Sequence, residues 1–346
     1  MKKGIASTSF DIAELAGVSQ PTVSRALRNS PLVSAETRER VQAIARELNY
    51  KVDKNAANLR SKTTKTLAVL IFDDAMSGDG NINPFFLSML GSITRTASIE
   101  GYDLLVSFQE MSEDWHSQYL AAHRADGLIL LGYGDHIVYQ EKLQALNEAG
   151  SNFVIWGPQL KTESACSLSC NNRLGGELAG KHLLELGHRQ IVFLGNANDN
   201  FPEYQMRYEG FLKAHEDAGV ALAESHCIPA PEDNGYAAIG RLLDSGQQFT
   251  AIFAASDFMA MGAVKAVNER GLRVPDDISV VGFDDILAAN YLNPPLTTVR
   301  QDTTKAGRLM VERLIRLIDG DSIKSSYVTP NLVVRRSCSA PRSSDE

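Results

Sequence analysis

Acidic, aromatic and basic side chains stand at the ends of short apolar segments in the larger, C-terminal part of this sequence. The residues that we expect to contact a small ligand are Asp73, Phe85, Phe86, Tyr133, Trp156, Arg207, Asp257 and Asp284. Carboxylate and guanidinium groups form paired hydrogen bonds with neighbouring hydroxyl groups, and an aromatic face covers the apolar face of a sugar ring. This set of side chains therefore predicts a binding site for a polyol such as a sugar.

Two of these positions have a second interpretation. Asp284 and Asp285 could form an acid/base pair, but adjacent residues point apart, so we interpret Asp284 as a ligand contact and Asp285 as a helix cap. Trp156 could belong to the core, although it ends an apolar segment and is followed by Gly157 and Pro158, which favour a loop.

The sequence gives little support to an enzyme. His182 and His188 have no Cys or carboxylate at metal-ligand spacing, and we interpret them as packing or capping residues. Neither glycine-rich phosphate-binding pattern is present, and no nucleophile can be paired with a base. We expect no enzyme activity, no cofactor and no metal site.

A different group of polar residues lies near the N-terminus, and its types suit the edges of DNA bases. The group comprises Ser19, Gln20, Pro21, Thr22, Ser24, Arg25 and Asn29. Arg25 can pair with guanine through two hydrogen bonds, Gln20 can do so with adenine, and Pro21 can contact a thymine methyl group.

Three short helices are predicted to carry this group. The first begins at the pair Thr8 and Asp11 and ends at Gly17, which permits a tight turn. The second, about Gln20 to Arg28, is capped by Ser19 and turns Val23 and Leu27 inward, and Ser34 caps the third. Two short helices joined by a glycine turn indicate a helix-turn-helix.

Periodicity alone leaves open a plain three-helix bundle, and charge favours DNA binding. Residues 1–62 contain 11 Lys and Arg against 6 Asp and Glu, whereas the remainder contains 23 against 36. A basic head on an acidic body is suited to phosphate contact.

The rest of the chain alternates between predicted strands and helices. The apolar segments are LAVLIF, YDLLVSF, GLILLG, FVIW, QIVFLG, AIFAA and ISVVGF, and amphipathic stretches such as 85–100, 174–186 and 257–270 lie between them. This alternation predicts parallel sheets covered on both faces, and about 280 residues divide naturally into two lobes. Ligands of such sheets bind beyond the carboxyl ends of the strands, so we expect the ligand between the lobes.

Composition sets the outer limits. The chain has 346 residues, of which 44% are hydrophobic, so two or three domains with buried cores are expected. No apolar run reaches membrane-spanning length, and residues 1–10 lack the hydrophobic stretch of a signal peptide, so we expect a cytoplasmic protein. The four cysteines are expected to be free thiols.

The N-terminal residues carry a specific resemblance. The run FDIAELAGVSQPTVSRALRNSPLVSAETRERVQAIARELNY is similar to the DNA-binding domain of the lactose-repressor/galactose-repressor family, with its A-x-x-A-G-V-S-x-x-T-V-S-R pattern intact. The segment that follows resembles the family's hinge, with Ala56 and Leu59 at the positions of its A-x-x-L element. The resemblance implies a hinge helix in the minor groove with Leu59 wedged between base pairs. Asp53, Lys54 and Asn55 replace the usual start of that hinge, so its first residue stays open.

The body resembles the effector domain of the same family. The matching segments include the run from Asn172 to His188, Ser256 with Asp257, PDDISVVGFDD, PPLTTVRQDTTKAG and LVVRRSC. The resemblance implies an all-α helix-turn-helix head plus an α/β, two-lobed, periplasmic-binding-protein-like (type I) effector domain with parallel sheets and three crossing strands. It also places Arg207, Asp257 and Asp284 at positions that contact effector in the family. The implied boundaries are 1–52 for the head, 53–65 for the hinge and 66–346 for the effector domain, with lobe 1 at about 66–163 and 294–323 and lobe 2 at about 164–293 and 324–340.

These features predict a transcriptional regulator, most simply a repressor of carbohydrate-utilisation genes that a sugar or sugar derivative releases from a palindromic operator. A nucleobase-type corepressor is the alternative, and a solute-binding protein or an enzyme with a DNA-binding head fits less well. We expect a homodimer, because one head covers a single half-site and residues 331–346 lack the leucine heptads of a tetramer. The effector, the sign of its effect and the operator sequence stay open.

Overall fold

The computed structural model describes residues 8–50, 63–72, 82–109, 113–132, 136–157, 166–198, 200–221, 226–230 and 234–342. The chain divides into two units, Met1–Thr64 and Lys65–Glu346. The first is the helical head, and the second contains two lobes, each built on one sheet.

The head consists of α1 (Ser9–Ala16), α2 (Gln20–Leu27) and α3 (Ala35–Glu47). At the start of α1 the backbone N–H of Thr8 donates to Asp11 Oδ2 at 2.7 Å, and the N–H of Asp11 donates to Thr8 Oγ1 at 3.4 Å. These bonds form a capping box and lower the pKa of Asp11. Gly17 ends the helix with φ 65°, so the predicted start and end of this helix are confirmed.

A small apolar core holds the three helices together. Ile12, Val23, Ala26 and Val41 are completely buried. Leu27 packs against this core, as predicted, although its side chain is half-buried and Ala26 takes the fully buried position beside it.

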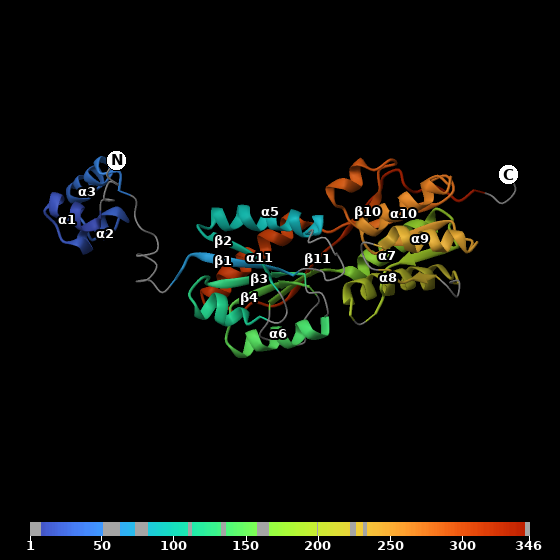
Figure 1. Ribbon diagram of the computed structural model, residues 1–346, viewed down its shortest axis with the longest axis horizontal. Helices are drawn as coiled ribbons and strands as arrows, with labels where there is room; N and C mark the ends of the chain where they lie inside the picture. Colours follow the sequence, from blue (N-terminus) through green and yellow to red (C-terminus); the bar gives the residue numbers. More distant parts are fainter. Residues whose placement is uncertain are drawn as a thin grey trace, which may run out of the picture. The chain divides into compact units, whose positions relative to one another are not determined.

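The second unit contains two sheets of six strands (Figure 1). The first sheet has the order β11-β5-β4-β3-β1-β2, with β1 at Thr66–Phe72, β2 at Asp103–Gln109, β3 at Gly127–Leu131, β4 at Phe153–Trp156, β5 at Cys166–Cys170 and β11 at Ser326–Val328. The second has the order β12-β10-β9-β8-β6-β7, with β6 at Ile191–Leu194, β7 at Cys227–Ile228, β8 at Ala251–Ala254, β9 at Ser279–Asp284, β10 at Thr297–Arg300 and β12 at Asn331–Val333. Neighbouring strands in the described sheets run parallel, except that β12 runs antiparallel to β10. The two-lobed architecture with parallel sheets is therefore confirmed.

Helices cover both faces of the first sheet, and the residues of β1 alternate between them. Leu67 and Val69 face the cluster of α5 (Pro84–Ile99) and α11 (Thr303–Ile318), whereas Ala68 and Leu70 face α6 (His136–Glu148) and the short π-helix η1 (His116–Ala121). Figure 1 shows α5 and α11 on one side of this sheet and α6 on the other. Burial on both faces explains why the strand reads as a continuous apolar run.

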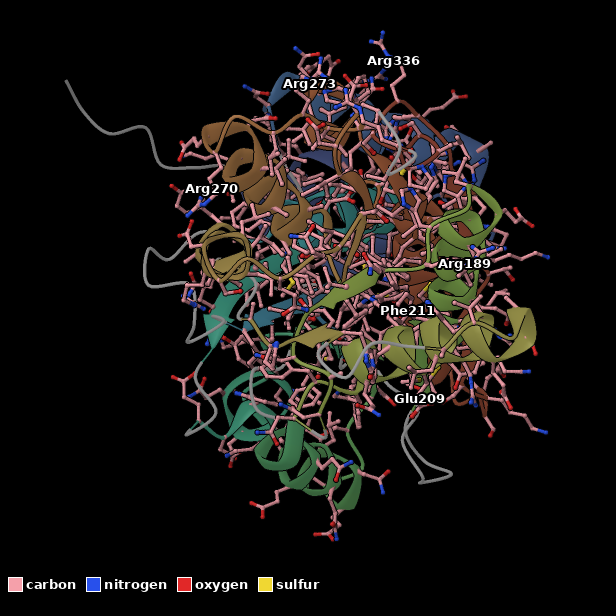
Figure 2. All side chains as sticks on the ribbon, turned by 90° about the vertical axis from the view of Figure 1, so that its right-hand side faces the viewer. Arg189, Glu209, Phe211, Arg270, Arg273 and Arg336 are labelled. Atoms are coloured by element: carbon pink, nitrogen blue, oxygen red, sulfur yellow. The ribbon has the colours of Figure 1, made fainter. Side chains whose placement is uncertain are left out.

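In the second lobe α7 (Asn172–Glu185) and α8 (Pro202–Ala218) pack against each other, while α9 (Gly235–Asp244) packs against α10 (Asp257–Glu269). Two glycines permit the close approach of α7 and α8. A Cβ on Gly176 would lie 1.9 Å from the carbonyl oxygen of Arg207, and a Cβ on Gly210 would lie 1.9 Å from that of Arg173. Phe211 of α8 fills the interior beside them, and Figure 2 marks its position in this lobe.

The chain passes between the lobes at three described places: Asn171 after β5, residues 301–302 after β10, and residues 329–330 after β11. The three crossings were expected, but they lie later in the sequence than the expected lobe boundaries at about 163, 294 and 323. β5 and β11 are hydrogen-bonded within the first sheet, and β10 is hydrogen-bonded within the second. The chain therefore changes lobe only after each of these strands has ended.

None of the helices in the described ranges is both long and apolar enough to span a lipid bilayer.

Candidate ligand-binding site and nucleic-acid interface

A cavity of about 380 Å³ lies where the two lobes face each other. Its first wall comes from α5 and α11 of the first lobe, and its second from the end of β9 and the short 3-10 helix η3 (Leu287–Tyr291) of the second lobe. The lining residues are Pro84, Phe85, Ser88 and Thr303 from the first lobe, and Asp284, Asp285, Ile286, Leu287, Ala288 and Tyr291 from the second. Its volume lies within the range of small-molecule sites.

Asp284 is the buried acid on the cavity wall, as predicted for a ligand contact. Its side chain is 7% exposed, and its Oδ1 accepts a hydrogen bond from Gln301 Nε2 at 2.6 Å. Burial raises the pKa of Asp284 to about 6, although the Arg207 guanidinium and Gln301 oppose this. Its Oδ2 has no hydrogen-bond partner among the described residues, so one acceptor oxygen of the wall is available to a ligand.

Arg207 lies behind Asp284, outside the cavity lining. Its Nη1 is 3.9 Å from Asp284 Oδ1, and its guanidinium carbon lies 3.8 Å from the centroid of the Phe283 ring. Asn172 Oδ1 accepts from Nε at 2.9 Å and the carbonyl of Ala255 accepts from Nη1, which fixes the plane of the group. Arg207 thus supports Asp284 from behind, and its second terminal nitrogen has no acceptor among the described residues.

Asp257 occupies a different place from the one predicted. It is fully buried, its Oδ2 accepts from the backbone N–H of Ile286 at 2.8 Å, and its Oδ1 accepts from the hydroxyl of Thr298 at 2.5 Å. Burial and the nearby Asp284 carboxylate raise the pKa of Asp257 well above its ordinary value. Both carboxylate oxygens of Asp257 are hydrogen-bonded to residues of the second lobe, so Asp257 does not line the cavity. It holds the backbone at Ile286, which does line the cavity.

Asp285 is not the helix cap that the sequence suggested. Its Oδ2 accepts from Arg300 Nε at 2.6 Å and its Oδ1 from Arg335 Nη2 at 2.5 Å, and the 3-10 helix that follows has no side-chain cap. The Asp285 carboxylate therefore binds two arginines that are distant in sequence and does not cap the helix that follows it.

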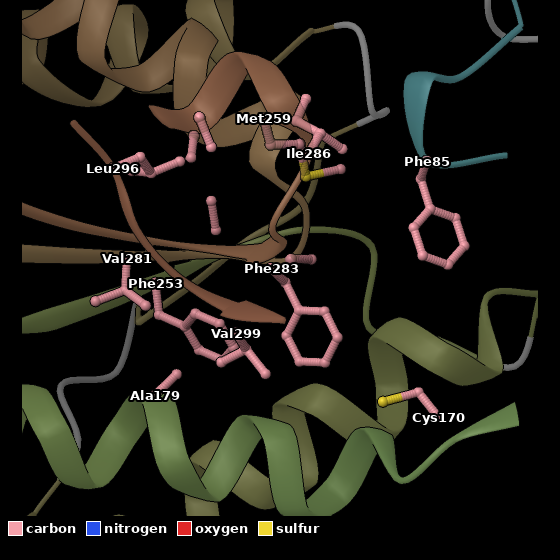
Figure 3. Close-up of a cluster of buried hydrophobic side chains, with 14 of the residues drawn as sticks. Phe85, Cys170, Ala179, Phe253, Met259, Val281, Phe283, Ile286, Leu296 and Val299 are labelled. Carbon is pink, nitrogen blue, oxygen red and sulfur yellow. The ribbon is translucent and has the colours of Figure 1, made fainter. Parts of the chain in front are cut away.

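The predicted aromatic residues gather around Phe85. The Phe85 ring lies 5.3 Å from that of Phe86 and 5.9 Å from that of Trp156, measured between centroids. Only Phe85 lines the cavity, whereas Trp156 is 6% exposed and supports it from behind. Figure 3 shows Phe85, at the start of α5, across from Ile286 and Phe283 of the second lobe.

Asp73 and Tyr133, which were also expected at this site, lie outside the described residues. Sequence reasoning missed the polar lining residues Ser88, Thr303 and Tyr291, and also Gln301, which bonds to Asp284. Ser88 and Thr303 share a hydrogen bond of 2.9 Å between their hydroxyl oxygens, at the first-lobe wall. Ser88 lies one helical turn after Phe85, and this spacing could have identified it. The sequence around Gln301 does not predict its role, because its bond to Asp284 depends on the path of the chain from β10 to α11.

The histidines behave as predicted for packing residues. The side chain of His188 is buried, with Nδ1 2.8 Å from Thr250 Oγ1 and Nε2 2.8 Å from the carbonyl oxygen of Ser339. Burial lowers the pKa of both His182 and His188. Among the described residues no group of three His, Cys, Asp or Glu side chains could hold a metal ion.

On the head, the predicted reading group lies along α2 and at its two ends. Ser19, Pro21, Arg25 and Asn29 are exposed, and Gln20, Thr22 and Ser24 are half-buried. Pro21 stands in the first helical turn, as predicted, but Ser19 makes no side-chain bond to the backbone, and its hydroxyl lies 2.9 Å from that of Thr22. Arg25 forms no side-chain hydrogen bond with another described residue, so its guanidinium is available to a partner. Ala56 and Leu59 lie outside the described residues.

Two protein-family models match this chain. The model of the bacterial regulatory proteins of the lacI family matches residues 10–53, and the model of the periplasmic binding protein-like domain matches residues 181–338. The HTH-type transcriptional repressor PurR of Haemophilus influenzae is 33% identical over 346 residues, covering 96% of this chain and 98% of its own.

Two solved structures extend the likeness to the whole fold. The lac repressor dimer bound to operator and the anti-inducer ONPF is 29% identical, with a TM-score of 0.82, and covers 97% of this chain and 100% of its own. A complex of the transcriptional regulator CelR with cellobiose is 30% identical, with a TM-score of 0.71, and covers 96% and 99%.

Proposed function

From the premise that this chain belongs to the lacI family of bacterial regulatory proteins and is a DNA-binding repressor, we propose that a sugar or sugar derivative, bound between the lobes, releases it from a palindromic operator. The genes it controls would then be genes of carbohydrate utilisation. The sugar, the release and the palindrome are the parts of this proposal that go beyond family membership.

The observation that carries the proposal is the buried acid on the cavity wall. Asp284 presents on the cavity wall an oxygen that has no hydrogen-bond partner among the described residues, and Ser88 and Thr303 line the facing wall with hydroxyl groups. A carboxylate oxygen and hydroxyl groups can pair with neighbouring hydroxyls of a polyol, and the Phe85 ring offers an apolar face. The CelR complex with cellobiose supports a carbohydrate ligand for a protein of this fold at 30% identity.

The charges around the cavity narrow the class of sugar. Asp285 is neutralised by Arg300 and Arg335; among the described residues Arg207 is the cation that pairs with the Asp284 carboxylate, and Asp257 adds a further acid beneath it. A phosphate group would meet this carboxylate and one partly engaged guanidinium, and the like charges of phosphate and carboxylate repel each other. We therefore propose an uncharged or amine-bearing sugar, not a sugar phosphate.

A nucleobase is the second candidate, and the aromatic residues favour it. The Phe85 ring lies within stacking distance of both Phe86 and Trp156, and a flat ring could extend this cluster. A carboxylate such as Asp284 accepts hydrogen bonds from ring N–H groups equally well. A base acting as corepressor would tighten operator binding, so the sign of the effect separates the two candidates.

DNA recognition is proposed to use two copies of the head. The exposed Arg25 and Pro21 and the half-buried Gln20 lie along one α2 helix, and a recognition helix of this length reads one half-site in the major groove. A twofold dimer would read both halves of a palindrome, and the lac repressor, which is solved as a dimer on its operator, supports this assembly. The parts of Ala56 and Leu59 in the minor groove are proposed from sequence alone.

The first experiment is a thermal-shift panel on the full-length protein. The panel contains neutral sugars, the 6-phosphate and 2-amino derivative of each hexose, and the nucleobases. A neutral or amino sugar should raise the unfolding temperature, since a ligand that binds only the folded state stabilises it. Stabilisation by a sugar phosphate alone would contradict the charge argument, and stabilisation by bases alone would replace the sugar by the second candidate.

The second experiment compares Asp284→Ala with Asp244→Ala, using operator duplex and the ligand found in the panel. Asp244 is a matched control, because it also accepts from an arginine, Arg270, but lies away from the cavity. We expect Asp284→Ala to bind operator as the wild type does and to lose the response to ligand, while Asp244→Ala keeps it. Full response in Asp284→Ala would show that the site is misplaced, and tighter operator binding by the wild type with ligand would reverse the sign of the switch.

A further inference from the structure

The turn that follows β9 is held in an unfavourable backbone conformation. Asp284 has φ 117° and Asp285 has φ 57°, so two successive residues with side chains adopt the left-handed region that favours glycine. Such conformations persist only where the surroundings fix them, and they collect at functional sites.

Asp285 fixes the turn to two other segments of the second lobe. Arg300, which donates to its Oδ2, is the last residue of β10 and stands directly before the crossing at 301–302. Arg335, which donates to its Oδ1, follows β12 and the crossing at 329–330. Arg335 also donates from Nη1 to the carbonyl of Leu296 at 2.7 Å, so its position is itself fixed.

The preceding residue links the same turn to the cavity. Asp284 lines the cavity and accepts from Gln301 twice, at Oδ1 from the side chain and at its carbonyl oxygen from the backbone N–H at 3.4 Å. Gln301 is the first residue of the second crossing, and α11 of the first lobe begins two residues later at Thr303. Asp284 therefore connects the cavity wall to the turn, and its bonds to Gln301 connect the turn to the second crossing.

We propose that Asp285 is a positioning residue that holds Asp284 in register with the two crossings, so that a displacement of the cavity wall moves the first lobe relative to the second. This inference rests on the proposed effector site for its biological meaning. Asp285 does not need to touch the ligand, because both of its oxygens are already bonded to arginines. It acts through Asp284, Arg300 and Arg335.

The competing interpretation is that Asp285 forms an ordinary ion pair that stabilises one lobe. Asp244 provides the control, because Arg270 donates to both of its oxygens at 2.8 Å within the same lobe. Arg270 lies at the edge of this lobe, where Figure 2 labels it. Asp244→Asn thus removes an Asp–Arg ion pair of the same lobe that contacts neither the turn nor the crossings, although Asp244 is more exposed than Asp285.

The test is amide hydrogen exchange of the full-length protein, which needs neither effector nor operator. Asp285→Asn should speed exchange about tenfold or more both in residues 286–291 and across the crossing in residues 301–306, because loss of two charge-assisted bonds frees the turn. Asp244→Asn should leave both segments unchanged. Faster exchange confined to 286–291, or equal effects of the two variants at 301–306, would overturn the proposal.

A double-variant comparison supplies a readout that a merely stabilising ion pair would not give. Asp284→Asn perturbs the cavity wall, and we expect it to change exchange at 301–306 in the wild type but to add little in the Asp285→Asn background. Additive effects would mean that the two residues act independently and would refute transmission through Asp285.

A milder variant covers the case in which Asp285→Asn does not fold. Arg300→Gln removes one of the two arms, and its side chain is 48% exposed, so the fold should tolerate the change. It should speed exchange at 301–306 less than Asp285→Asn but more than Asp244→Asn. An Arg300→Gln protein indistinguishable from wild type at 301–306 would also contradict the proposal. Failure of the sugar panel would leave these outcomes unaffected.

Discussion

Asp284 is expected to reduce the stability of the ligand-free protein, and Asp284→Asn should raise it. The carboxylate is 7% exposed, and burial raises its pKa from 3.8 to about 6. In the unfolded chain the same group ionises freely, so at neutral pH folding must place a charge where the neutral form is preferred. Asparagine resembles the protonated carboxyl in shape and has no such preference. It also tolerates the left-handed conformation of this residue.

The expected gain in unfolding free energy of Asp284→Asn follows from the pKa shift of Asp284. One pKa unit corresponds to about 1.4 kcal/mol, so the shift of roughly two units limits the gain in unfolding free energy to about 3 kcal/mol near neutral pH. The attraction to Arg207 and the bond from Gln301 are already included, because both lower the pKa. Removal of the Asp284 charge also lowers the pKa of Asp257, an effect of the same sign.

The raised pKa of Asp284 fixes the direction in which its contribution to the unfolding free energy changes with pH. Between the unfolded pKa of 3.8 and the folded pKa of about 6, the folded protein binds more protons at Asp284 than the unfolded chain does. The stability contributed by this group therefore falls as pH rises through that window and is level above it. On lowering the pH from near 7 to near 5, the wild type should regain about 1 kcal/mol relative to Asp284→Asn, and the remainder should return by about pH 3, below the unfolded pKa.

Urea unfolding of both proteins at several pH values would measure this difference. Asp244→Asn serves as the control, since the bonds from Arg270 lower the pKa of Asp244 and predict the opposite trend. A wild type that loses stability relative to Asp284→Asn on acidification would refute the account of a desolvated carboxylate, as would two parallel curves.

Other predictions concern the framework. Gly176→Ala should destabilise the protein by about 1–3 kcal/mol and weaken ligand binding, because the new Cβ meets the backbone of Arg207; Gly91→Ala, a helical position with no atom within 4 Å, should be neutral or slightly stabilising in the same urea titration. Arg25→Ala should lower affinity for operator more than for random duplex at fixed salt, and equal losses would make it a phosphate contact. Thr8→Ala should cost about 1 kcal/mol of head stability, measured by thermal unfolding of residues 1–64, and an unchanged midpoint would deny the capping box.

Most of the fold could be predicted because its signals are local. The apolar runs identified β1, β3 and β4, and Thr8 and Gly17 identified the ends of α1, because a buried strand or a capped helix is encoded within a few neighbouring residues. Leu15 shows the limit of this reasoning. It repeats at helical spacing with Ile12, yet it is 62% exposed, since three short helices offer too little surface to cover it.

The site was predicted less completely, because strand ends identify acids without showing which way they face. Asp257 and Asp284 both follow apolar strands, but only Asp284 reaches the cavity. The difference depends on Thr298, which is 41 residues from Asp257 and bonds to it, and on Gly282, where a Cβ would lie 2.2 Å from Asp257 Oδ1. Neither relation can be read from local sequence. Asp285 was misinterpreted for the same reason, because Arg335 lies 50 residues away.

The cavity wall combines features that each oppose stability: two residues in the left-handed region and a desolvated carboxylate next to another acid. The fold retains them because four side chains bond to the turn: Asp257, Gln301, Arg300 and Arg335. A ligand that pairs with Asp284 would relieve part of this unfavourable energy in whichever lobe arrangement brings Phe85 and Ser88 within its reach. A ligand shifts such an equilibrium only by its difference in affinity for the two arrangements. The proposed release of operator therefore requires an effector that contacts both walls of the cavity. By reciprocity, operator DNA would then weaken effector binding by the same factor by which the effector weakens operator binding.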